Sequence, residues 1–91
     1  MYVVICYDVE DDRRRTRLHK HLASYGVPVQ KSVFECDLDR GRLARALEGA
    51  ARIINRKTDS LRCYPLCAAC RAGIVAFGYS ESAGPVQVVV V

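Results

Sequence analysis

One carboxylate, Asp8, stands where it could bind a metal ion. It directly follows the apolar run YVVICY at residues 2–7, and such a run predicts a buried strand that ends at Asp8. Mg²⁺ binds through one or two carboxylates, keeps several waters and contacts phosphate oxygens. A single Asp8 is therefore half a site, and two copies related by a two-fold axis could share one ion. A structural Asp8 is the alternative.

The acidic residues after Asp8 are better explained as the start of a helix than as metal ligands. Glu10, Asp11 and Asp12 are further candidate ligands, but carboxylates at a helix start are favoured by the helix dipole and cap its free N–H groups. We therefore expect a helix that begins at Asp11 or Asp12 and runs to about Tyr25, where a glycine follows.

Arginine supplies most of the positive charge in a chain of net charge +4. Its planar fork of donors suits phosphate, although an arginine-rich composition can also reflect the genome. A predicted helix at 40–56 places four of its arginines within an arc of about 80°, opposite the apolar stripe. A solvated helix face and a phosphate-binding ridge are both open interpretations. The ridge consists of Arg42, Arg45, Arg52 and Arg56.

The first helix carries a second set of arginines. Arg13 and Arg17 share one side, whereas Arg14 and Arg15 flank the apolar stripe near Asp8. An arginine beside a carboxylate at a strand end forms a structural ion pair or holds a phosphate at a metal site. Spacing alone leaves both open.

The cysteines Cys63, Cys67 and Cys70 form a C-x₃-C-x₂-C pattern. A structural zinc site needs four ligands, and no fourth Cys or His follows nearby. Redox chemistry would need the CxxC at the start of a helix after a strand, whereas a short turn is expected here. We therefore expect packed or idle thiols and no zinc, with zinc binding and redox activity as alternatives.

These residues must be positioned by alternating strands and helices on one domain at 1–78, followed by a hinge and strand at 79–91. Helices that are apolar on one stripe imply a single antiparallel sheet covered on one face, so the predicted class is α+β, a ferredoxin-like sandwich. The expected elements begin with a strand at 2–8, a helix to about Tyr25, and a strand at 29–37 that is bent or bulged near Lys31-Ser32. A helix at 40–56, a strand at 60–66 and a short turn or helical turn at 67–72 follow, and the last elements are strands at 73–77 and 86–91.

Both faces of the first strand are apolar, yet the helices can cover only one of them. A second subunit is the economical cover for the other, so we expect a homodimer. The uncharged tail VQVVVV at 86–91 would aggregate on an exposed edge, and we expect it to pair with the partner subunit. Pairing within its own chain is the alternative.

Several classes are excluded by length and pattern. Ninety-one residues allow one domain, and no apolar run approaches the roughly 18–20 residues of a membrane span. The start of the chain lacks the features of a signal peptide, and the odd number of cysteines argues against a disulfide framework. We expect a cytoplasmic protein with no membrane partner.

Three segments together resemble the Cas2 family of small CRISPR-associated proteins. They are YVVICYDVEDDRRRTRL, GVPVQKSVFECDL, and DSLRCYPLCAAC with GIVAFG, and they cover about residues 2–78. The resemblance implies a ferredoxin-like homodimer that takes part in spacer acquisition with the CRISPR integrase, and in many members a Mg²⁺-dependent endonuclease of RNA or DNA. By position, Asp8 matches the metal-binding carboxylate. The other matches to catalytic positions are Tyr7, Arg15, Arg17 and Phe34. A basic residue of some members corresponds here to Pro28, which weakens one substrate contact.

Two further hypotheses stay open. The first is a non-catalytic scaffold that binds duplex DNA through its arginines in the integrase complex. The second is a toxin-like RNA interferase, because such proteins share the fold. The predicted nucleic-acid contacts are Arg13, Arg14, Arg17, Arg42, Arg45, Arg52 and Arg56.

Overall fold

The computed structural model describes residues 1–77 and the strand residues 87–88. The predicted hinge at 78–85 and most of the predicted last strand lie outside the described residues. Within the described part, no helix is long and apolar enough to cross a membrane.

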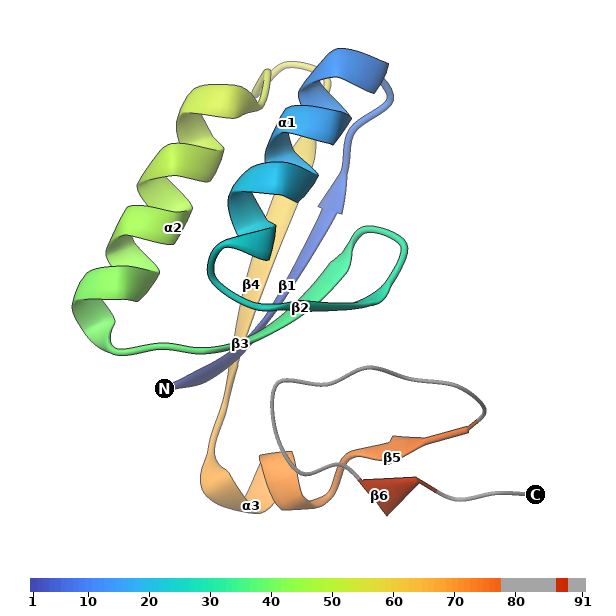
Figure 1. Cartoon of the computed structure of the whole chain (residues 1–91), viewed down its shortest axis with the longest axis vertical. Coiled ribbons are helices and arrows are strands. Elements are labelled where there is room, and N and C mark those ends of the chain that lie inside the picture. The colour runs from blue at the N-terminus through green and yellow to red at the C-terminus, as the bar shows by residue number, and fades with distance from the viewer. Residues whose placement is uncertain (78–86, 89–91) are drawn as a thin grey trace.

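A four-stranded antiparallel sheet forms the centre of the protein. Strand β1 (Tyr2–Asp8) lies between β3 (Val33–Asp37) and β4 (Ser60–Leu66), and β2 (Val27–Gln30) lies outside β3. Helices α1 (Asp12–Ala23) and α2 (Arg40–Ile53) run side by side over one face of this sheet (Figure 1). The order βαββαβ with both helices on one face is the predicted ferredoxin-like α+β sandwich.

Each long helix begins where a side-chain cap satisfies its first free N–H groups. Asp11 accepts a hydrogen bond from the N–H of Arg14 at 2.9 Å, and Asp39 accepts one from the N–H of Arg42 at 2.8 Å. The predicted starts of both helices are confirmed. The helix predicted at 40–56 instead ends at Ile53, because Ile54 has extended backbone angles. Arg56 therefore lies in the turn after α2 and is not on a helical ridge.

The single strand predicted at 29–37 is wrong. The segment is a hairpin of β2 and β3, paired antiparallel with an irregular register between Pro28 and Gln30. The chain reverses at the turn Lys31-Ser32, where Ser32 has a φ of 67°, a left-handed conformation that non-glycine residues seldom adopt. The bend expected at this point is in fact a complete reversal, and it supplies the fourth strand of the sheet.

The core lies between the sheet and the helices. Side chains alternate across a strand, so Val3, Ile5 and Tyr7 of β1 point toward the helices and are buried. They pack against Leu18 and Leu22 of α1. The even-numbered residues of β1 point to the opposite face, and Asp8 is the last of them.

After β4 come a short helix, α3 (Ala68–Ala72), and two short strands, β5 (Val75–Ala76) and β6 (Gln87–Val88). These strands pair in parallel within the chain as a separate two-stranded sheet, below the main sheet in Figure 1. Arg71 joins α3 to the main sheet, because its guanidinium lies 3.3 Å from the Asp37 carboxylate and 4.1 Å from the centre of the Tyr2 ring.

Candidate metal centre and nucleic-acid interface

Asp8 is exposed at the end of the central strand, opposite Ser60 of β4. Among the residues that the structure describes, its carboxylate has neither a hydrogen bond nor an ion pair. Since Tyr7 points toward the helices, Asp8 points toward the opposite face. The carboxylate is thus available to a ligand from outside the chain.

Among the described residues, Asp8 is not part of a cluster of metal-binding side chains. No group of three or more His, Cys, Asp or Glu side chains that could hold a metal occurs within the described part of the chain. Mg²⁺ accepts one or two protein carboxylates and completes its shell with water. A free, exposed Asp8 fits that chemistry as half of a site, and the second half would come from another chain.

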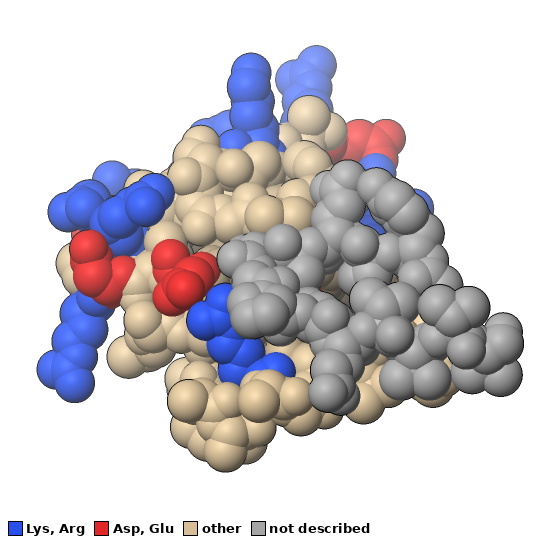
Figure 2. All heavy atoms as spheres, turned by 60° about the horizontal axis from the view of Figure 1, so that its bottom comes forward, with Lys and Arg blue, Asp and Glu red and all other residues tan. Residues whose placement is uncertain are grey.

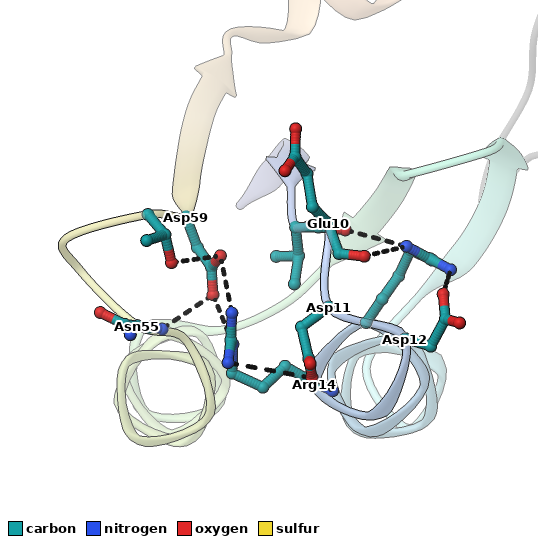
Figure 3. A network of polar contacts seen from close by, with 9 residues as sticks. Glu10, Asp11, Asp12, Arg14, Asn55 and Asp59 are labelled. Carbon is teal, nitrogen blue, oxygen red and sulfur yellow. Dashed lines mark hydrogen bonds and ion pairs between the residues drawn. The ribbon is translucent and has the colours of Figure 1, made fainter.

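Arg15 fixes the backbone that follows Asp8. Its Nη1 donates to the carbonyl oxygens of Val9 at 3.1 Å and Glu10 at 3.0 Å, and its Nη2 pairs with Asp12 (Figure 3). A guanidinium that bridges two successive carbonyls holds the loop in one shape. Arg15 therefore positions the end of β1 relative to α1.

Arg14 is held in an ion-pair network between the two long helices (Figure 3). Its Nε lies 2.9 Å from Oδ2 of Asp59, and its Nη1 lies 3.8 Å from Asp11. Asp59 also accepts the N–H of Asn55 at 2.8 Å, and its side chain is only 1% exposed. The Arg14 guanidinium, followed by this backbone N–H, lowers the pKa of Asp59 below its usual value. Of the two hypotheses for Arg14, a structural ion pair is correct, but its partner is Asp59 and not Asp8. Because its guanidinium is held by Asp59, Arg14 is not available to nucleic acid.

Phe34 lies in the core and is fully buried. Its ring stacks on Tyr7 at 6.3 Å and meets the edge of His19 at 5.1 Å. The resemblance matches Phe34 to a catalytic position, but its ring is buried and cannot contact a substrate directly. Phe34 can contribute to the site only by supporting the rings of Tyr7 and His19.

Tyr7 is 7% exposed. Burial raises the pKa of its phenol, and the hydrogen bond with Ser32 and the charge of Arg15 partly offset this increase. The phenol therefore stays protonated at neutral pH and can serve as a hydrogen-bond donor.

Tyr7 also lines a cavity of about 260 Å³ between α1 and the β2–β3 turn. Sequence reasoning missed four residues of this lining, because it treated the hairpin as one continuous strand. The four are Thr16, His19, Lys31 and Ser32.

The remaining arginines of the prediction are exposed, and in Figure 2 basic side chains project from the left and upper margins of the molecule. Arg42 is partly engaged, since it lies 5.5 Å from the centre of the Tyr25 ring and 3.4 Å from the carbonyl oxygen of Ser24. Within the described residues the others have no hydrogen bond or ion pair. These free guanidiniums are Arg13 and Arg17 on α1, Arg45 and Arg52 on α2, and Arg56 in the following turn.

The sheet face opposite the helices carries apolar side chains. Val4 and Cys6 of β1 are only half-buried, and Tyr64 of β4, which pairs with Val4, is 45% exposed. Val75 and Phe77, near β5, are also more than half exposed. Large exposed apolar side chains that adjoin a sheet face are typical of a surface for association.

All five cysteines are free. Burial raises the pKa of Cys36 to about 11, so this thiol is a packed core residue. Cys67 and Cys70 are exposed, and the N–H of Cys70 donates to Sγ of Cys67 at 3.4 Å. Hydrogen bonds from Cys70 lower the pKa of Cys67, whereas contact with Cys67 raises the pKa of Cys70. Within residues 1–77, Cys63, Cys67 and Cys70 do not form a cluster that could hold a metal.

These features define a small ferredoxin-like protein with an unpaired carboxylate at the end of its central strand and free arginines on its helices. The family model for CRISPR associated protein Cas2 matches residues 1–74. The chain belongs to the Cas2 family.

Relatives and solved structures agree with this assignment. A CRISPR-associated endoribonuclease Cas2 of Rhodospirillum rubrum is 46% identical over 69 residues, which are 76% of this chain but only 56% of that protein. One from Chloroflexus aurantiacus is 40% identical over 79 residues and covers 86% of this chain and 85% of its own length. The crystal structure of Streptococcus pyogenes Cas2 superposes with a TM-score of 0.69 at 35% identity, covering 74% of this chain and 87% of that one. A further Cas2 crystal structure has a TM-score of 0.72 at 29% identity and covers 98% and 97% of the two chains.

Proposed function

We propose that this chain is a metal-dependent endonuclease that acts as a homodimer on RNA or DNA in CRISPR adaptation. The observation that carries the proposal is the free, exposed Asp8 at the end of the central strand, next to an arginine-rich helix. The printed names of the relatives, endoribonuclease and endonuclease Cas2, support the reaction class. We expect this function in the cytoplasm, without a membrane partner.

The homodimer follows from the apolar face of the sheet. Exposed Tyr64 beside half-buried Val4 and Cys6 leaves apolar surface that a second copy would remove from water, at about 25 cal/mol per Å². Two such faces brought together also bring two sheet ends, and with them two Asp8 residues, toward one axis. Strand β6 pairs with β5 of its own chain, so we propose pairing with the partner subunit only for the edge of β6 that faces away from β5.

Two Asp8 carboxylates, one from each subunit, would hold one Mg²⁺. Bound there, Mg²⁺ would polarise the scissile phosphate and lower the pKa of a coordinated water. Arg17 is exposed and has no partner among the described residues, so it can bind a phosphate oxygen. Arg15 and Tyr7 keep the loop and strand end that carry Asp8 in place.

Replacement of the carboxylate tests this proposal. We expect Asp8→Asn to abolish Mg²⁺-dependent cleavage of defined RNA and duplex DNA, because the amide removes the charge that attracts the ion. The matched control is Glu48→Gln, an exposed carboxylate on α2, which should keep wild-type cleavage. Light scattering should show both variants at the mass of the wild type. Wild-type cleavage by purified Asp8→Asn would refute the catalytic proposal.

The dimer has its own test. Tyr64→Glu places a charge on the apolar face and should convert the dimer to monomer, whereas Ala44→Glu places the same charge on exposed α2 and should not. The measurement is mass by light scattering at several protein concentrations. A wild type that is monomeric at all of them would contradict the shared metal site.

The free arginines favour a second candidate function, a scaffold that holds duplex DNA beside the integrase. Basic side chains that contact phosphates raise affinity without reading sequence, and each contact adds about 0.9 to the slope of log affinity against log salt. Neutralising Arg42, Arg45, Arg52 and Arg56 together should weaken duplex binding and flatten that slope by up to about 3–4. An unaltered slope would count against this surface.

A further inference from the structure

We propose that the cavity between α1 and the β2–β3 turn binds one unpaired nucleotide of the nucleic acid. The inference rests on the proposed function and deepens it, because it assigns a single-stranded or frayed substrate. The cavity holds about 260 Å³, just below the roughly 300–1,000 Å³ of sites for drug-sized ligands. It therefore suits one heterocycle rather than a larger ligand. Its lining is Tyr7, Arg15, Thr16, His19, Lys31 and Ser32.

An exposed ring on a rigid base forms one wall of the cavity. His19 is exposed on α1, and its ring rests edge-on against the buried ring of Phe34 at 5.1 Å. Tyr7 stacks on the same Phe34. Proteins bind unpaired bases by stacking them on aromatic and histidine rings that are already held in place. The support from Phe34 gives His19 that property, although it lies on the surface.

The charges of the lining suit a nucleotide rather than a neutral ligand. No carboxylate lines the cavity, whereas Arg15 and Lys31 both do. Arg15 already donates to Val9, Glu10 and Asp12. Lys31 is exposed at the tip of the hairpin and has no partner among residues 1–77, so its ammonium can meet a phosphate.

The remaining polar groups fit the edge of a base. Thr16 and Ser32 contribute hydroxyls, each of which can donate and accept a hydrogen bond. Ser32 is held in place because its carbonyl accepts the N–H of Tyr7 at 3.1 Å and its φ of 67° fixes the turn. Base edges present donors and acceptors that such hydroxyls can pair with.

The position of the cavity connects it to Asp8. Tyr7, in its lining, immediately precedes Asp8 in the chain, although the two side chains point to opposite faces of the sheet. Arg15 holds the carbonyls of the two residues that follow Asp8. A strand anchored in the cavity is therefore bound by the same rigid unit that carries the carboxylate. The bases of a blunt duplex stay stacked in pairs and cannot enter, so the cavity should distinguish single strands from duplexes.

Binding without cleavage tests the inference. A labelled short single-stranded RNA and the matching blunt duplex are titrated with the full-length protein in EDTA, with fluorescence anisotropy as the readout. We expect His19→Ala to weaken single-strand binding about 10-fold, the loss of one stacked base. Lys31→Ala should weaken it a few-fold, and His19→Phe, which keeps a stacking ring, should restore affinity. The matched control Lys57→Ala removes the same charge from another exposed turn and should change affinity less than about twofold. Binding of the duplex should stay the same in all these variants.

Three results would overturn the inference. The first is wild-type single-strand affinity in the double variant His19→Ala/Lys31→Ala, and the second is an equal loss of affinity for the single strand and the duplex. The third is a loss with Lys31→Ala but none with His19→Ala, because that result would mean a phosphate contact alone. Because both substituted residues are exposed, thermal unfolding should show that the variants fold normally. The titration in EDTA does not depend on Asp8, so its failure is separate from a failure of the Asp8→Asn cleavage assay.

Discussion

Replacing Gly49 by alanine should destabilise the protein, against the usual effect of this change in a helix. Gly49 lies in the middle of α2, where alanine is normally favoured over glycine by about 1 kcal/mol. Here α1 approaches closely, because a Cβ at position 49 would lie 2.5 Å from Nε2 of His21 and closer still to Cε1. The imidazole also bonds to the carbonyl oxygen of Ala46 at 2.8 Å. Alanine would therefore displace the ring and break this bond.

The magnitude follows from three opposing contributions. Overpacking costs about 1–3 kcal/mol, and the lost hydrogen bond costs about 1 kcal/mol. The helix propensity of alanine returns about 1 kcal/mol. We expect Gly49→Ala to lower the free energy of unfolding by about 1–3 kcal/mol, and the melting temperature by at least about 4 °C.

A double-mutant cycle in urea or by thermal unfolding isolates the contact, at one fixed protein concentration because association shifts stability. In a His21→Ala background the same glycine change should stabilise by about 1 kcal/mol, since the clash is gone. Gly41→Ala is the matched control, because it lies in the same helix and its Cβ would have no atom closer than 3.5 Å. Stabilisation by Gly49→Ala in the wild type, or an equal effect in both backgrounds, would refute the reasoning.

Two further predictions concern the network around Asp59 and the hairpin turn. The Arg14 guanidinium and the Asn55 N–H lower the pKa of Asp59 in the folded state, so its contribution to stability should be complete above its unfolded pKa of about 3.9 and lost as the pH falls through the folded value. The melting temperature of Asp59→Asn should accordingly lie below that of the wild type at pH 7, and the gap should close in strong acid; a gap that is constant with pH would contradict this. Ser32→Val should lower the free energy of unfolding by about 1–2 kcal/mol, because a β-branched residue tolerates a φ of 67° poorly. Ser32→Gly should be at least as stable as the wild type. If urea unfolding showed the valine variant to be more stable than the glycine variant, the turn would not be strained.

The elements that the sequence predicts well are those with strong local signals. Strand β1 and strand β4 have runs of strand-forming residues between clear breakers, and the starts of α1 and α2 are marked by the caps Asp11 and Asp39. The hairpin was missed because its turn is Lys31-Ser32, without the glycine or asparagine that usually marks a positive φ. Tertiary pairing of β3 with β1 imposes that turn, which propensity does not reveal.

In the candidate site, too, only the features with a local sequence signal could be predicted. Asp8 could be located because strand and carboxylate are adjacent in the sequence, so the end of β1 and the side-chain alternation fix its place. The roles of Arg14 and Phe34 could not be predicted from the sequence, because they depend on partners far away in the chain. Arg14 pairs with Asp59, and Phe34 packs against Tyr7 and His19. The cavity depends on the same distant contacts, since it exists only where the missed hairpin turn meets α1.

The place of β1 at the centre of the sheet constrains how the chain can fold during synthesis. Its residues Tyr2–Asp8 pair on one side with β3 and on the other with Ser60–Leu66. Strand β1 is synthesised first, but both its edges can be paired only after the chain has been made to about residue 66. Closing so long a loop slows folding. A ribosome stalled before that point should present β1 with an unsatisfied edge, a substrate for chaperones rather than a folded intermediate.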